Sequence, residues 1–127
     1  MSPILPLRPW VTTLSFDSAI RLNFKVYKLG FGFSEKVYEN AMMIKLSQYK
    51  LPSIQQAPIN VHFEGQCVGE YFPDIFVDNK IIVELKAVSL LSKAHEAQLI
   101  HYLKATNVKV GLLINFSEKL KVVRRVI

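Results

Sequence analysis

The residues best placed to do chemistry are a carboxylate and a lysine on one predicted strand. Glu84 and Lys86 stand two residues apart in an otherwise apolar run over 81–87, so both side chains project from the same face. Burying two charges in a strand this apolar would be costly unless something nearby compensates them. The preceding strand carries Asp74, a second carboxylate that could lie beside Glu84.

Whether Asp74 reaches that face depends on the loop between the two strands, because directly opposite residues of an antiparallel pair point the same way. A two-residue turn would set Asp74 opposite Val83, turned away from Glu84. A three-residue loop over 78–80 pairs Asp74 with Glu84 instead, but one of its last two residues must be left-handed, and Asn79 is the more tolerant type. We predict the three-residue loop.

Two carboxylates side by side repel each other, so one is driven towards protonation unless a cation lies between them. All-oxygen ligands of this kind suit Mg²⁺ or Mn²⁺. Such an ion polarises a phosphate and lowers the pKa of its bound water, and Lys86 would hold that water or stabilise charge on the phosphate. The spacing indicates metal-assisted phosphodiester hydrolysis. An ordinary salt bridge between Glu84 and Lys86, with Asp74 solvated, stays open on spacing alone.

Periodicity predicts the elements that must hold these residues in place. Apolar residues at three- and four-residue spacing predict a helix over about 15–29, and a second helix follows the N-cap Ser34 and ends at 50–52. Further on, the pattern predicts strands at 59–63, 68–77 and 81–87, a helix at 92–105, and strands at 108–114 and 120–127. The order α-α-β-β-β-α-β-β implies an α/β fold, with helices flanking a mixed sheet of about four or five strands.

The length of 127 residues fits a single domain, which we place at 13–127 behind an extended arm at 1–12. The 16 Lys and Arg against 10 Asp and Glu give a charge of +6, a modest excess that favours a polyanionic partner. The lone Cys67 excludes a disulfide framework and a four-cysteine metal site, so we expect a cytoplasmic protein. Neither a membrane-spanning run nor a signal peptide is expected.

Several motifs resemble those of one enzyme superfamily. Pro73-Asp74 followed by Glu84-Leu85-Lys86 resembles the signature of the PD-(D/E)XK nucleases. The segment 32–38 reads as G-x-x-E-x-x-Y, similar to the small "GxxExxY" family of that superfamily, and 98–102 resembles the Q-x-x-x-Y element of RecB-like nucleases. The likeness spans about 16–127 and implies a restriction-endonuclease-like core.

The resemblance also implies roles for individual residues. Asp74 and Glu84 would be metal ligands, joined by the main-chain carbonyl of Leu85, and Lys86 would be the catalytic lysine. Glu35 would be a further acidic ligand, directly or through water. Without the resemblance, Glu35 is better explained as a first-turn acid favoured by the helix dipole.

The predicted helix at 92–105 carries the remaining candidates. Gln98 and Tyr102 are four residues apart, hence neighbours on one helical face, and the resemblance implies that they contact the substrate. The alternative for Tyr102 is a core aromatic. His95 has no second His or Cys at ligand spacing, so we interpret it as a surface histidine rather than a zinc ligand.

These observations favour a Mg²⁺- or Mn²⁺-dependent nuclease that acts on nucleic acid, with DNA preferred to RNA. One rival is a catalytically inactive nucleic-acid-binding module, whose affinity would fall with salt but ignore a chelator. A second rival is an assembly module, in which the arm containing Trp10 docks on a neighbour and the chain forms a homodimer.

Overall fold

The computed structural model describes residues 19–127. The predictions for the arm at 1–12 and for the start of the first helix lie outside the described residues. The chain is helical over 19–26 and continues into the 3₁₀ turn η1 (Tyr27–Leu29), so the predicted first helix ends in a tighter turn.

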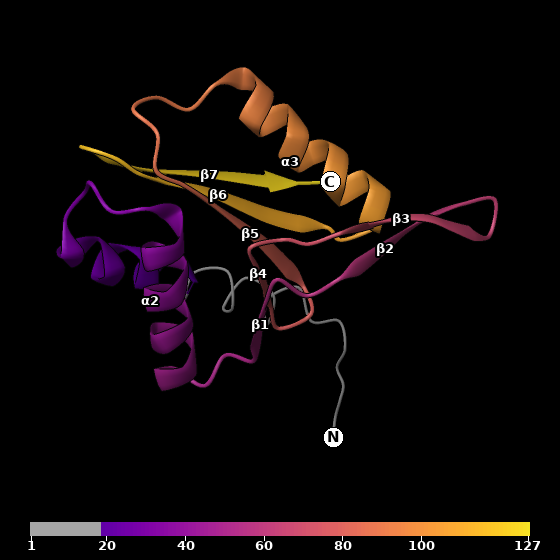
Figure 1. Cartoon of the computed structure of the whole chain (residues 1–127). Helices are drawn as coiled ribbons and strands as arrows, with labels where there is room; N and C mark the ends of the chain where they lie inside the picture. Colours follow the sequence, from indigo (N-terminus) through magenta and orange to yellow (C-terminus); the bar gives the residue numbers. More distant parts are fainter. Residues whose placement is uncertain (1–18) are drawn as a thin grey trace.

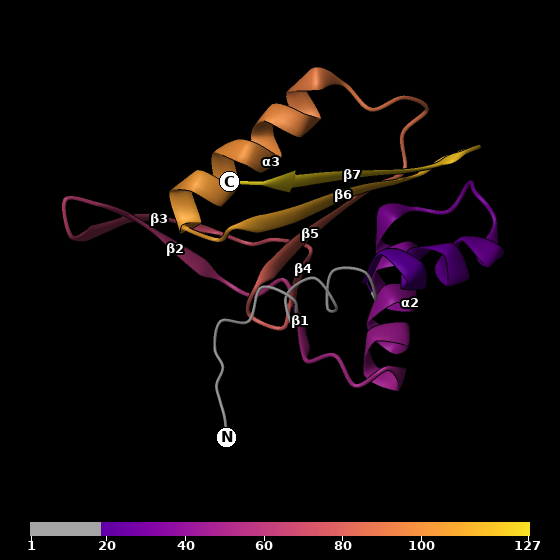
Figure 2. The same cartoon turned by 180° about the vertical axis from the view of Figure 1, so that it is seen from behind.

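Two longer helices cover opposite faces of a central sheet (Figures 1 and 2). Helix α2 (Glu35–Gln48) begins directly after Ser34, which has the extended backbone of an N-cap residue, as the sequence predicts. Helix α3 (Lys93–Thr106) lies on the other face and agrees with its predicted range within a residue. Within residues 19–127, no helix combines the length and the apolar character needed to cross a bilayer.

The sheet is mixed and five-stranded, which confirms the predicted architecture. In spatial order its strands are β1 (Ser53–Gln55), β4 (Ile75–Val77), β5 (Ile81–Lys86), β6 (Val110–Phe116) and β7 (Leu120–Val126). Strands β5 and β6 run parallel and are joined by the crossover helix α3, whereas the other three pairings are antiparallel. The central position of β5 places the segment with Glu84 and Lys86 in the middle of the fold.

The prediction of one continuous strand over 68–77 is wrong, because the structure has two separate strands in this region. Strand β3 (Gln66–Tyr71) pairs only with β2 (Ile59–Phe63) in a separate hairpin, and β4 starts anew at Ile75. Pro73 lies at the break and cannot donate a ladder hydrogen bond, which explains the interruption. The hairpin extends to one side of the main sheet (Figure 1). The sequence also missed the edge strand β1, which is too short to show a period.

The core is split between the two faces of the sheet. On β5, Ile81, Val83 and Leu85 are buried in a cluster that includes residues of α2, whereas Ile82 is buried in a cluster with Leu99 of α3. Since side chains alternate along a strand, this fixes which face each charged residue of β5 uses. Glu84 and Lys86 belong to the face covered by α3.

Gly111 on β6 gives a test of the packing under α3. A Cβ atom there would lie 2.8 Å from Cδ1 of Leu99 and 3.2 Å from both terminal carbons of Leu103. We expect Gly111→Ala to lower the free energy of unfolding by about 1–3 kcal/mol, because packed side chains must shift. Urea unfolding measures this. Gly69→Ala, on exposed β3 with nothing within 4 Å, is the control, and equal losses would contradict the packing.

Candidate active site

The register of β4 and β5 brings the two predicted carboxylates together. Ile75 pairs with Val83 and Val77 pairs with Ile81, so the next pair along the strands is Asp74 and Glu84. This register requires a three-residue loop, which confirms the prediction.

The geometry of the loop differs in one detail. Asp78 and Asn79 both have left-handed backbones, with φ of 54° and 53°, and the Lys80 N–H donates to the Val77 carbonyl oxygen at 3.0 Å. Asn79 is left-handed as expected, and the left-handed backbone of Asp78 is an additional feature that was not predicted. Two consecutive left-handed residues suit the twist of a hairpin, and Asp tolerates this conformation better than Lys.

Hydrogen bonds to the main chain hold Asp74 and Glu84 beside each other. The Asp74 N–H donates to Glu84 Oε2 at 3.2 Å, and the Leu85 N–H donates to Asp74 Oδ2 at 2.7 Å. Because Pro73 ends the regular ladder, the Asp74 side chain takes the place of a backbone acceptor. Each carboxylate is thus oriented by an N–H group of the opposite strand.

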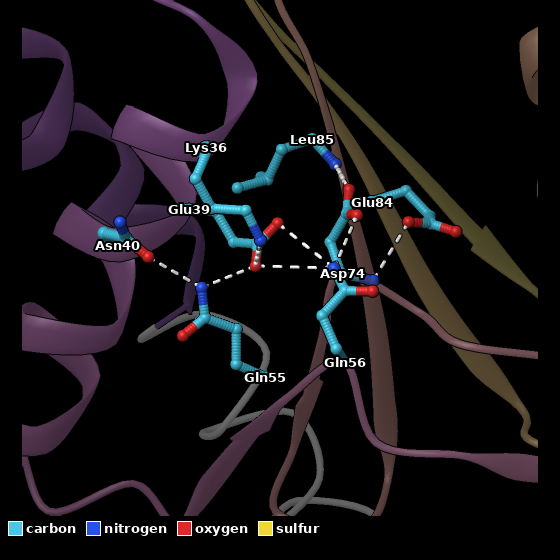
Figure 3. A network of polar contacts seen from close by, with 8 residues as sticks. All are labelled: Lys36, Glu39, Asn40, Gln55, Gln56, Asp74, Glu84 and Leu85. Carbon is cyan, nitrogen blue, oxygen red and sulfur yellow. Dashed lines mark hydrogen bonds and ion pairs between the residues drawn. The ribbon is translucent and has the colours of Figure 1, made fainter.

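A third carboxylate, which the sequence analysis did not select, faces Asp74 from helix α2 (Figure 3). Glu39 is only 3% exposed and accepts hydrogen bonds from Lys36 at 2.9 Å and Gln55 at 2.5 Å. Gln56 Nε2 donates both to Asp74 Oδ1, at 3.3 Å, and to the Glu39 carboxylate, at 3.3 and 3.4 Å. The amide of Gln56 therefore links the helix to the strand that carries Asp74.

Glu35 lies one helical turn before Glu39, in the first turn of α2, and is exposed. Both glutamates line a cavity of about 560 Å³ together with Gln56 and Asp74. The signal that could have found Glu39 is its four-residue spacing from Glu35, which puts the two on one helical face. The arrangement assigns Glu39, rather than Glu35, to direct contact with the hydrogen-bond network around Asp74.

On the side of the sheet covered by α3, a second series of side-chain contacts ends at Glu84. Gln98 Nε2 donates to the Tyr102 hydroxyl at 3.0 Å, and the Tyr102 ring stacks on Tyr71 with centroids 3.7 Å apart and planes 19° apart. The Tyr71 hydroxyl in turn donates to Glu84 Oε1. The candidates Gln98 and Tyr102 are therefore connected to Glu84 through Tyr71, a residue that the sequence analysis read only as part of a strand.

Burial makes both central carboxylates weaker acids. Desolvation raises the pKa of Glu84 from 4.5 to about 7, opposed by the Asp74 N–H and the charge of Lys86 and assisted by Glu39 and Glu35. Desolvation likewise raises the pKa of Asp74, and the Leu85 N–H opposes it. A carboxylate with a strongly shifted pKa, such as Glu84, is typical of functional sites. A cation bound between the two carboxylates would favour their ionised forms and so lower both pKa values.

The shift of Glu84 has a measurable consequence for stability. The folded protein keeps a proton on Glu84 up to about pH 7, whereas the unfolded chain releases it near 4.5. The stability contributed by protonated Glu84 is therefore complete below pH 4.5 and is lost as the pH rises through 7. We expect the stability of wild type relative to Glu84→Gln to fall by about 2 kcal/mol between pH 4.5 and 8 in EDTA. Urea unfolding across this range measures it, and a constant difference would contradict the burial of Glu84.

His95 has a structural role at the start of α3. The Ser92 hydroxyl accepts from the His95 N–H at 3.2 Å, and His95 Nδ1 accepts from the Ser92 N–H at 3.1 Å. These reciprocal bonds satisfy two N–H groups at the helix terminus. The half-buried His95 thus works as a cap.

The donor set fits a hard divalent cation. Asp74 and Glu84 supply carboxylate oxygens, and the polar side chains found around them within residues 19–127 are carboxylates, an amide, a tyrosine hydroxyl and a lysine rather than Cys or His. Oxygen ligands of this kind suit Mg²⁺ or Mn²⁺. In the present structure both carboxylates point at main-chain N–H groups. Among residues 19–127, no three His, Cys, Asp or Glu side chains already form a group that could hold a metal ion.

Solved structures share this fold. An alkaline exonuclease from Laribacter hongkongensis matches with a TM-score of 0.54 and 10% identity, over 73% of this chain and 56% of that one. The protein SSO0001 matches with a TM-score of 0.50 and 15% identity, over 85% and 61%. This chain thus spans less than two thirds of either protein. The flanked mixed sheet with acids at the β4–β5 pair defines the class as a restriction-endonuclease-like α/β protein.

The sequence itself narrows the class. The profile of the PD-(D/E)XK nuclease superfamily matches residues 15–126, nearly the whole chain, and the chain belongs to that superfamily. No curated protein sequence matches it significantly. Nucleases hydrolyse phosphodiester bonds in nucleic acid, and those of this superfamily generally use divalent metal ions.

Proposed function

We propose that this protein is a Mg²⁺- or Mn²⁺-dependent nuclease of the RecB-like, GxxExxY type that cleaves DNA. The observation that carries the proposal is the pairing of Asp74 with Glu84, two half-buried carboxylates with raised pKa values, and the presence of Lys86 on the strand that carries Glu84. An ordinary salt bridge between Glu84 and Lys86 would not require a second half-buried carboxylate beside Glu84. A cation site for phosphate chemistry accounts for the two neighbouring, half-buried carboxylates and for the lysine beside Glu84.

The proposed ligands are the Asp74 and Glu84 carboxylates and the main-chain carbonyl of Leu85. When bound, the ion supplies Lewis-acid activation of the phosphate and a more acidic water. Glu39 and Glu35 add negative charge on the α2 side of Asp74, and Gln56 keeps the Asp74 carboxylate oriented. Lys86 would orient the attacking water or neutralise charge on the phosphate, while Gln98 and Tyr102 would line the substrate path on the α3 side.

The substrate assignment rests on charge as well as on the family. The chain carries a formal charge of +6, which favours a polyanion although the centre of the site is acidic. A basic surround and an acidic centre suit a metal-dependent enzyme that acts on phosphates. Cys67 is exposed and unpaired, in keeping with a reducing compartment such as the cytoplasm.

A cleavage assay tests the proposal. Labelled single-stranded and double-stranded DNA, with RNA of the same sequence, are incubated with protein in Mg²⁺, in Mn²⁺ and in EDTA. We expect DNA cleavage with either ion and none in EDTA. Nucleic-acid binding that falls with salt, ignores EDTA and leads to no cleavage would replace this proposal with an inactive binding module on the same fold.

A further inference from the structure

Two exposed phenylalanines stand beside the acidic cavity, on the loop between η1 and α2. Phe31 is 59% exposed and Phe33 is 48% exposed. Phe33 lines the cavity that contains Glu39 and Asp74, and both rings line an adjoining hollow of about 250 Å³. Ala87, the residue after Lys86, borders both spaces. The aromatic surface is therefore continuous with the candidate active site.

The path of the loop that carries these rings depends on two glycines. Gly30 and Gly32 have φ of 87° and 109°, in a region that residues with a side chain rarely adopt. An added Cβ would meet nothing within 4 Å at either glycine, so it is the backbone path and not the space that calls for glycine. Glycine on each side of Phe31 thus allows the chain to follow this route past the cavity.

A buried tyrosine fastens the loop to the core. The hydroxyl of Tyr38, a fully buried residue, donates to the Gly30 carbonyl oxygen at 2.6 Å and accepts from the Phe33 N–H at 3.3 Å. The Tyr38 ring stacks on Phe116 with centroids 4.3 Å apart. In the G-x-x-E-x-x-Y segment, Gly32 and Tyr38 therefore shape the loop while Glu35 faces the cavity. The two hydrogen bonds of the Tyr38 hydroxyl thus hold the main chain on both sides of Phe31.

We propose that Phe31 and Phe33 form a stacking platform for an unpaired base of the substrate. The inference rests on the proposed nuclease function and adds the substrate class, a single strand or an unpaired end. Aromatic rings bind any base through its π-face, but only when that base is free of its own stack. A base held on Phe33 would leave its phosphate next to the cavity that Asp74 lines. Base-paired DNA would present its backbone but not its base faces.

The test is equilibrium binding by fluorescence anisotropy in EDTA, where a metal-dependent enzyme leaves its substrate intact. Wild type is titrated against a labelled single strand and against a blunt duplex of the same sequence. We expect tighter binding of the single strand, and about tenfold weaker single-strand binding for Phe31→Ala and for Phe33→Ala. Phe33→Trp, which keeps an aromatic face, should restore affinity.

Matched controls separate stacking from general hydrophobic effects. Phe24→Ala removes a phenylalanine that is also 59% exposed but lies in the helix at 19–26, and Phe63→Ala removes one on the β2–β3 hairpin. Neither should change single-strand affinity. Wild-type affinity in the Phe31→Ala and Phe33→Ala variants, equal losses in the controls, or a preference for duplex would overturn the platform. A change in light-scattering mass without a change in affinity would overturn it too, in favour of an interface between copies.

The same preparations are assayed for cleavage in Mn²⁺, which keeps the two proposals apart. If wild type cleaves DNA and the phenylalanine variants bind the single strand as tightly as wild type, the stacking platform is contradicted and the nuclease function is supported. Single-strand binding that depends on Phe31 and Phe33 without any cleavage keeps the binding role and removes the nuclease. Absence of both binding and cleavage overturns both.

Discussion

Lys86→Ala is expected to slow DNA cleavage by about 10²–10³-fold while leaving Mn²⁺ affinity nearly unchanged. Lys86 shares a strand face with Glu84 and its charge lowers the pKa of that carboxylate, so it lies close to the proposed reaction centre. It is not itself a ligand, because an ammonium has no lone pair to offer a cation. Single-turnover cleavage measures the rate, and isothermal titration with Mn²⁺ measures the affinity.

Lys80→Ala is the matched control, since Lys80 adjoins the opposite end of β5 and its side chain forms a 3.7 Å ion pair with Asp78. It should cleave at the wild-type rate. A Lys86→Ala protein that cleaves as fast as wild type would contradict the role given to Lys86. An equal loss of cleavage in the Lys80→Ala protein would show that the rate depends on positive charge near β5 in general and not on Lys86 in particular.

Asp74→Asn is expected to weaken Mn²⁺ binding by at least about 100-fold and to abolish cleavage. Replacing even a residue that only orients a metal ligand usually costs 10–100-fold in affinity, and Asp74 is proposed as a ligand itself. The asparagine carbonyl oxygen can still accept the Leu85 N–H, which holds Asp74 at 2.7 Å in the wild type, so the fold should persist. Calorimetric titration gives the affinity, and circular dichroism gives the fold.

Glu70→Gln serves as the control, because Glu70 is an exposed acid on β3 outside the network around Asp74. Its Mn²⁺ affinity and cleavage rate should match the wild type. If the Asp74→Asn protein is folded and binds Mn²⁺ as tightly as wild type, the carboxylate pair is not the metal site.

The centre of the site could be predicted from the sequence because a local rule determines it. The length of the 78–80 loop sets the register of β4 and β5, and that register alone decides whether Asp74 and Glu84 are neighbours. The apolar run around Glu84 likewise predicts a central strand, which β5 is. Periodicity also gave the helices, since α2 and α3 each bury one face against the sheet.

The surroundings of the site depend on contacts between distant segments and could not be predicted. Glu39 and Gln56 meet only because β1 pairs with β4, and a three-residue strand has no recognisable period. Tyr71 approaches Glu84 only because Pro73 breaks the predicted long strand and frees the hairpin to lie under α3. These contacts arise from tertiary packing, and the residues on either side of them in the sequence show no pattern that would predict them.

The most direct test of the metal site is anomalous diffraction from crystals of the protein soaked in Mn²⁺. We expect a manganese peak in contact with the Asp74 and Glu84 carboxylates and the Leu85 carbonyl oxygen, with both side chains turned from their main-chain N–H partners. Asp74→Asn crystals treated alike should lose that peak. Manganese bound elsewhere with this pair left empty, or no bound manganese at concentrations that support cleavage, would contradict the account.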